Sequence, residues 1–221
     1  DTDWLIDRFA LVQLPSIQSL RFLRTRSGNG PGQRAPLAAF GDPALLGVAE
    51  TRGGLDGGTF DTGVNTMRGS LANVAAIRQL ARLPGTATEL TAIARSLAAP
   101  SASVMLGENA TESRIKKTDL SRTRIIAFAT HGLLAGEVDG LSEPGLVFTP
   151  PQTATEDDDG LLTASEIAQL DLDADWVLLS ACNTAAGEAA GSEGLTGLAK
   201  SFFYAGARSL LASHWPVRDD L

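Results

Sequence analysis

Two residues of this chain have the chemistry of a catalytic pair. Cys182 is the only cysteine, and it follows directly on the apolar run WVLLSA at 176–181. His131 follows a second apolar run, RIIAFAT at 124–130. A thiolate is a strong nucleophile, and a neighbouring imidazolium lowers the pKa of a thiol below its ordinary value of about 8.5. The two residues together predict nucleophilic catalysis. Taken alone, Cys182 is more typical of a small buried core residue. Taken alone, His131 is more typical of a strand-end side chain whose hydrogen bonds are made within the fold.

The elements that must position this pair alternate between strand and helix, which predicts an α/β sandwich with a largely parallel sheet. Strands are expected at 9–14, 36–41, 103–107, 124–130, 145–149, 176–181 and 208–215. Helices are expected at 15–24, 71–83, 86–97, 111–120, 163–170 and 195–205. Ligand sites of open α/β sheets lie outside the carboxyl ends of the strands, so adjacent strands would place His131 and Cys182 across one crevice.

Local signals mark the ends of several of these helices. Thr86 with Glu89, and Thr163 with Glu166, have the spacing of a capping box, and Gly206 suits the position after a helix. The segments at 25–35, 51–63 and 133–144 are predicted to be loops, and the last two of them to be mobile.

Composition narrows the class of protein. The 221 residues are 43% hydrophobic, enough for a sizeable core, and 26 acidic against 18 basic residues give a formal charge of −8. That charge disfavours nucleic acid and anionic membranes as partners. One cysteine forms no internal disulfide, and neither a signal peptide nor a long apolar span is present. These features favour a cytoplasmic compartment, and the start without Met indicates a fragment of a longer protein.

Four blocks of sequence carry a family resemblance. The interval from His131 to Cys182 is 51 residues, close to the roughly 50 of the caspase signature, although Ser180-Ala181-Cys182 stands where that signature has Gln-Ala-Cys. The blocks ATHG, DGLLTASEIAQLDL, LLSACNTAAG and GLTGLAKSFFYAGARSLLASHWPV occur in order at 129–132, 159–172, 178–187 and 194–217. Together they resemble the CHAT family of caspase-like cysteine proteases.

This resemblance implies a caspase-hemoglobinase fold and peptide-bond hydrolysis by a His131 and Cys182 dyad. Such domains commonly lie downstream of tetratricopeptide repeats, which implies a regulatory repeat region in the same polypeptide. We therefore expect residues 1–35 to form a strand, a helix and a linker leading from an upstream region. Residues 36–221 are expected to form the caspase-like domain, lacking its last helix. The expected partner is a protein substrate, with no cofactor.

Further residues are assigned around the dyad. The backbone N–H groups of Gly132 and Cys182 are the expected oxyanion donors, and a backbone carbonyl is a candidate to orient the imidazole, since no third side chain is identified. His214 is interpreted as a wall of the substrate groove together with Trp215, or else as an alternative base. The acidic run 157–159 lacks the ligand spacing of an EF-hand, and two histidines with one cysteine are too few for a zinc site, so no metal is expected.

The substrate preference is predicted from the charge of the residues near the strand ends. Asp42 follows the strand at 36–41, and Asp159 ends the acidic run, so a pocket selecting Arg or Lys before the scissile bond is favoured. Ser180 lies two residues before the nucleophile, where some related proteases carry an acid, so a pocket for a neutral side chain stays open.

Two alternatives to an endopeptidase stay open. The same fold with a silent site would be an interaction module, and the presence of both dyad residues weighs against it. A nucleotide binder on a doubly wound sheet ranks last, because no G-x-G-x-x-G motif or P-loop lysine follows any strand.

Overall fold

The fold is taken from a computed structural model of the whole chain. The structure describes residues 34–48, 67–68, 71–133, 135, 141–182 and 192–212, with the side chains of 67–68, 182 and 192–196 left out. The chain divides into two units, 1–32 and 33–221, and every described residue belongs to the second. The elements expected at 9–24, most of the loop expected at 25–35, the loop expected at 51–63 and half of that expected at 133–144 lie outside the described residues.

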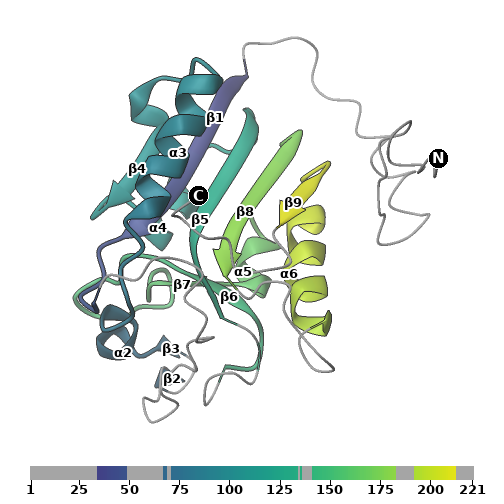
Figure 1. Cartoon of the computed structure of the whole chain (residues 1–221). Coiled ribbons are helices and arrows are strands. Elements are labelled where there is room, and N and C mark those ends of the chain that lie inside the picture. Colours follow the sequence, from purple (N-terminus) through teal and green to yellow (C-terminus); the bar gives the residue numbers. More distant parts are fainter. Residues whose placement is uncertain are drawn as a thin grey trace, which may run out of the picture. The chain divides into compact units, whose positions relative to one another are not determined.

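A parallel ladder of strands forms the centre of the described fold (Figure 1). Its order is β4, β1, β5, β8 and β9, and each strand runs parallel to its neighbour. The strands are β1 (Ala35–Pro43), β4 (Val104–Gly107), β5 (Thr123–Leu133), β8 (Trp176–Cys182) and β9 (Leu210–Ala212). β5 has the most buried sequence of the ladder, because its side chains are covered from both faces, as expected of a central parallel strand.

The complete sheet is mixed, whereas a largely parallel sheet was expected. β6 (Gly145–Val147) pairs antiparallel with the end of β5, and β7 (Leu161–Thr163) pairs antiparallel with β6. β5 is the reason, because it continues to Leu133 rather than ending at Thr130, and its last residues pair with the antiparallel strand β6. A separate antiparallel pair joins β2 (Met67–Arg68) to β3 (Leu71–Ala72).

The helices lie near the expected positions, but some bounds differ. They are α2 (Val74–Arg78), α3 (Gly85–Ser96), α4 (Glu112–Lys117), α5 (Ala164–Ile167), α6 (Ser192–Ala205) and the 3-10 turn η2 (Ser101–Ser103). The helix expected at 71–83 is wrong at its start, because 71–72 form a strand and Asn73 caps a short helix that begins at Val74. The capping box of Thr163 and Glu166 is confirmed at the start of α5. Gly206 has a φ of 117° directly after α6, which confirms its predicted position.

Helices pack on both faces of the parallel ladder (Figure 1). On one face, Leu90 and Ala94 of α3 contact the small side chains Ala39, Ala127 and Ala129. The core on the other face includes side chains from α4, α5 and α6 together with a group of phenylalanines. In that group Phe40 of β1 and Phe128 of β5 stack with ring centroids 5.7 Å apart. Alternate residues of one strand therefore face different helices.

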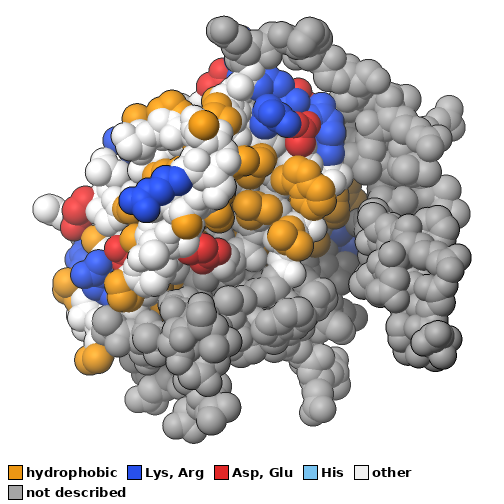
Figure 2. Space-filling view, turned by 45° about the horizontal axis from the view of Figure 1, so that its top comes forward, with side chains coloured by type: hydrophobic (Ala, Val, Ile, Leu, Met, Phe, Trp, Pro, Cys, Tyr) orange, Lys and Arg blue, Asp and Glu red, His pale blue; other side chains and the backbone are white. Residues whose placement is uncertain are grey.

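Charged side chains tie the amino ends of the ladder together. Asp175 precedes β8 and accepts hydrogen bonds from Arg34, Arg124 and Arg208, which precede or begin β1, β5 and β9. Figure 2 shows basic side chains gathered with acidic ones on the upper part of the described surface. Because these residues come from neighbouring strands, the network fixes the register at the end of the sheet opposite to His131. No helix in the described ranges is long and apolar enough to cross a membrane.

Candidate active site

The carboxyl ends of β5 and β8 bring the two predicted catalytic residues together. The strands are adjacent and parallel, and His131 is paired with Cys182 in their register. The pairing is a property of the backbone, and it joins residues 51 positions apart in the sequence. Both residues belong to the last three residues of their strands, whereas the sequence had suggested that they follow the strands. Each strand continues beyond the apolar segment that marks it in the sequence.

A backbone carbonyl orients the imidazole of His131. The side chain is 9% exposed, and its Nε2 lies 2.7 Å from the carbonyl oxygen of Ala81. A carbonyl can only accept, so Nε2 carries the proton of this hydrogen bond. In the neutral imidazole Nδ1 is then the basic nitrogen. The sequence suggested a backbone carbonyl as the group that orients the imidazole but did not say which one. The structure identifies it as the carbonyl of Ala81.

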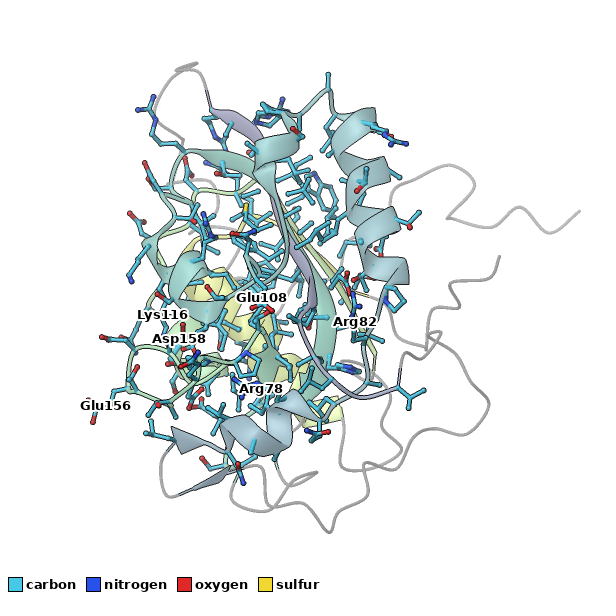
Figure 3. All side chains as sticks on the ribbon, turned by 90° about the vertical axis from the view of Figure 1, so that its left-hand side faces the viewer. Arg78, Arg82, Glu108, Lys116, Glu156 and Asp158 are labelled. Carbon is cyan, nitrogen blue, oxygen red and sulfur yellow. The ribbon has the colours of Figure 1, made fainter. Side chains whose placement is uncertain are left out.

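The segment that carries this carbonyl is anchored to the end of β1. Arg82 follows Ala81 and donates to both carboxylate oxygens of Asp42, at 3.1 and 3.2 Å. Figure 3 shows Arg82 on the chain that leads into α3. A parallel bridge between Gly47 and Ala81 adds a second attachment. The position of the histidine therefore depends on residues from β1 and from the entry to α3.

Asp42 occupies an unusual backbone position. The register of β1 with β4 shifts between Gly41 and Pro43, so Asp42 is the extra residue of a bulge, with a φ of 42°. Its side chain is largely buried, and its N–H donates to the hydroxyl of Thr86 at 2.8 Å. The Asp42 carboxylate, which the sequence assigned to substrate selection, is thus already engaged by Arg82.

Asp159 lies in a different set of contacts. Its carboxylate accepts from the N–H of Ala72 at 2.6 Å and from that of Leu161 at 3.0 Å, and its own N–H donates to Glu112. Burial raises the pKa of Asp159, against the lowering by the two N–H donors. Asp159 therefore ties the loop before β7 to β3 and α4, and these hydrogen bonds do not join it to His131, Asp42 or Ser180.

Ser180 contacts an acidic residue that the sequence assigned to another role. Its hydroxyl lies on β8, two residues before Cys182, and donates to Oε2 of Glu89 at 3.1 Å. The sequence predicted that Glu89 caps α3 together with Thr86. That prediction is wrong, because α3 begins at Gly85 with Pro84 as N-cap and no side-chain cap. The signal that could have located Glu89 is its place on the first turns of the helix that covers β5.

The remaining predicted site residues are placed only in part. Gly132 lies within β5 and is paired with Leu146 of β6, so its backbone has a fixed position next to His131. His214 and Trp215 lie outside the described residues, as does the side chain of Cys182. In the described ranges, no group of three or more His, Cys, Asp or Glu side chains could hold a metal ion.

An α/β fold whose neighbouring strands bring a histidine and a cysteine into register is consistent with a caspase-like fold. The chain belongs to the CHAT domain family, whose sequence profile matches residues 1–221. This match confirms the resemblance that the four sequence blocks indicated. A comparison with curated proteins found no match.

Proposed function

We propose that this chain is a cysteine endopeptidase of the caspase-like type, with His131 and Cys182 as its catalytic dyad. One observation carries the proposal, namely the in-register pairing of these residues on adjacent parallel strands. Membership of the CHAT domain family supports it. The helices on both faces of the ladder favour the three-layer, caspase-hemoglobinase-like arrangement.

The chemistry begins with a proton transfer. The thiol of Cys182 gives its proton to Nδ1 of His131, while Nε2 stays bonded to the carbonyl of Ala81. The thiolate then attacks the carbonyl carbon of the scissile peptide bond, and the backbone N–H groups of Gly132 and Cys182 stabilise the oxyanion. His131 returns the proton to the leaving amine, which leaves a thioester on Cys182 that water hydrolyses.

The substrate is proposed to be one or a few partner proteins. From the family resemblance we further propose that a tetratricopeptide-repeat region of the same polypeptide regulates the site. The charge of −8 favours a soluble protein partner over nucleic acid or an anionic membrane, and the cytoplasm is the proposed location.

The test uses Cys182→Ala and His131→Ala. Each is expected to abolish peptide hydrolysis and to leave the far-UV circular dichroism unchanged, because the dyad supplies chemistry rather than core packing. Substantial turnover by either well-folded variant would contradict the dyad.

A second measurement separates catalysis from a silent interaction module. Iodoacetamide labelling of Cys182, the only thiol, reports the thiolate directly. We expect fast labelling that His131→Ala slows and that His214→Ala, which removes the other histidine, leaves unchanged. An inert thiol in the wild type would favour the interaction module, and dependence on His214 would make that residue the base.

A further inference from the structure

A pocket opens at the carboxyl ends of β1 and β4, on the side of β5 away from β8. Its volume is about 810 Å³, which is within the range of ligand-binding clefts. Figure 3 shows four charged residues that line it, two arginines and two acids, namely Arg78, Arg82, Glu108 and Asp158. Because the carboxyl end of β5 carries His131, this pocket and the proposed dyad lie along the same edge of the sheet.

Arg82 links the pocket to the histidine. It follows Ala81, whose carbonyl oxygen lies 2.7 Å from Nε2 of His131. His131 and Cys182 are in register on β5 and β8, whereas the pocket is lined by residues that follow β1 and end β4. The strand order β8, β5, β1, β4 therefore places the cysteine, the histidine and the pocket one after another along this edge.

The proposed chemistry fixes the direction of a substrate on this edge. The sulfur of Cys182 attacks the carbonyl carbon, and His131 gives its proton to the nitrogen that follows this carbon. The scissile bond thus points from β8 toward β5, and the substrate chain after it continues toward β1 and β4. Neighbouring strands lie about 4.8 Å apart, and an extended chain advances about 3.4 Å per residue. The second to fourth residues after the scissile bond therefore reach the pocket.

Arg78 offers this pocket a positive charge. It is half-buried, and its Nη2 donates to the carbonyls of Pro150 and Pro151 at 3.2 and 2.7 Å. Among the residues that the structure describes, no carboxylate forms an ion pair with Arg78. Because both hydrogen bonds come from a single nitrogen, Nη1 and Nε of the guanidinium remain as donors for a ligand.

The two acids of the pocket do not neutralise this guanidinium. Asp158 faces the backbone N–H groups of Ser113 and Gly160, and Lys116 adds a compensating positive charge. Its charge is therefore balanced inside the fold. Glu108 is exposed, so water and salt screen its charge. A half-buried arginine is screened less, and it dominates the electrostatics that a ligand in the pocket meets.

We infer that this pocket selects substrates with an acidic side chain two to four residues after the scissile bond, and that Arg78 is the specificity-determining residue. This inference rests on the proposed endopeptidase function. The guanidinium binds the carboxylate through charge-assisted hydrogen bonds, which arginine forms in a planar, paired geometry. Leu46, which is 68% exposed, and Pro151 provide apolar contacts for the methylene groups of the same side chain. The substrate class is a protein segment with Asp or Glu shortly after the cleaved bond.

The test uses quenched fluorescent peptides with Glu, Gln or Lys at the second, third or fourth residue after the scissile bond. Each is made with Arg and with Leu immediately before that bond, and the two series are the Arg and Leu peptides. At one of the three positions, the wild-type chain is expected to prefer Glu over Gln by at least about tenfold in kcat/KM in both series. Equal rates for Glu and Gln at all three positions would overturn the inference.

Variants of Arg78 separate recognition from packing. Arg78→Gln keeps an amide donor for the two proline carbonyls and removes the charge, so the Glu preference is expected to disappear. Arg78→Glu is expected to invert it in favour of Lys. A purely structural role for Arg78 would lower the rates for Glu and Gln peptides together and leave their ratio unchanged, which would also overturn the inference.

The matched control is Arg95→Gln, which removes the same charge from an exposed residue in the last turn of α3. The Glu-to-Gln ratio is expected to stay at the wild-type value. Loss of the ratio in Arg95→Gln would indicate a general effect of net charge and would count against the pocket.

Peptide binding to Cys182→Ala keeps this inference separate from the proposed function. Fluorescence anisotropy is expected to show tighter binding of the Glu peptide than of the Gln peptide, and adding Arg78→Gln is expected to remove the difference. Hydrolysis that requires Cys182 and His131 but shows no Glu preference overturns the role of Arg78 and leaves the endopeptidase standing. Selective binding without hydrolysis by the wild type, or hydrolysis that persists in Cys182→Ala, removes the proposed function and the substrate role of the pocket with it.

Discussion

At the scale of single residues, Asp42 was predicted to select the substrate side chain, and the structure gives it a contact that leads to His131. Its left-handed backbone is tolerated by Asp better than by most residues, and its carboxylate holds the arginine next to Ala81. The carbonyl of Ala81 in turn holds His131. Asp42 is thus two contacts away from the imidazole, and in the proposed reaction it would act by positioning His131.

Asp42→Asn is expected to slow the hydrolysis of Arg and Leu peptides by the same factor, on the order of tenfold, because the anchor of His131 loosens. The measurement is kcat/KM for the two peptides. An Arg-to-Leu ratio that falls with the variant would instead return Asp42 to the substrate pocket.

The two capping-box sequences show what residue spacing can and cannot predict. Thr163 and Glu166 form the predicted box, whereas Thr86 and Glu89 have the same spacing and do not. The difference arises because Pro84, which precedes Thr86 by two residues, already occupies the N-cap. Thr86 is then inside the helix, and its partner Glu89 is directed to β8 by the packing of α3 on the sheet. Such tertiary contacts leave no local signal in the sequence.

At the scale of elements, one threonine joins the end of β1 to the start of α3. The hydroxyl of Thr86 is fully buried, accepts from the N–H of Asp42 and donates to the carbonyl of Leu83, both at 2.8 Å. This hydrogen bonding sets the distance between the bulge of β1 and the helix that carries Glu89.

Thr86→Val keeps the size of the side chain and leaves the N–H of Asp42 buried without its acceptor. The free energy of unfolding is expected to fall by about 1–3 kcal/mol, measured by urea denaturation. Thr88→Val, on the exposed side of the same helix, is the matched control and is expected to change it by less than about 0.5 kcal/mol. Equal effects of the two variants would contradict the buried hydrogen bond as the source of the stability, because both variants lose a hydroxyl and keep the β-branched shape.

The order and direction of the elements were predictable to different degrees. The sequence shows strands such as β1 and β5 as apolar runs, and the α/β alternation predicts the parallel ladder in which β5 lies between β1 and β8. The antiparallel pairing of β6 and β7 was not predicted, because a run of three residues carries no information on its direction. The direction appears only in the folded chain, where the extension of β5 to Leu133 offers β6 an edge to pair with.

At the scale of the whole molecule, the charge network around Asp175 links the amino ends of neighbouring strands, opposite to the proposed dyad. Burial alone would raise the pKa of Asp175, but hydrogen bonds from Arg34 and Arg124 and the charges of Arg34 and Arg208 lower it. A carboxylate whose pKa is lower in the folded state stabilises that state above its unfolded pKa, and the contribution is lost as the pH falls through the folded value.

Asp175→Asn is therefore expected to reduce the free energy of unfolding at pH 7 by about 1–2 kcal/mol, because three arginines lose a shared partner. The difference from the wild type should shrink as the pH is lowered below the ordinary Asp value of 3.8. Urea denaturation between pH 3 and 7 measures both effects. Asp157→Asn, at an exposed position, is the control. A difference that is the same at every pH would contradict a charge-based origin.

The pairing of His131 with Cys182 in the last described position of the β5–β8 ladder also bears on how such a site is switched. Hydrogen-bonded ladders open from their ends at little free-energy cost, while the interior stays closed. If the backbone hydrogen bonds at this end opened, the backbones of His131 and Cys182 would separate, and the Asp175 network at the far end would keep the strands aligned. The proposed dyad therefore lies at one end of the β5–β8 pairing, where the two backbones could separate and pair again while the rest of the sheet stays intact.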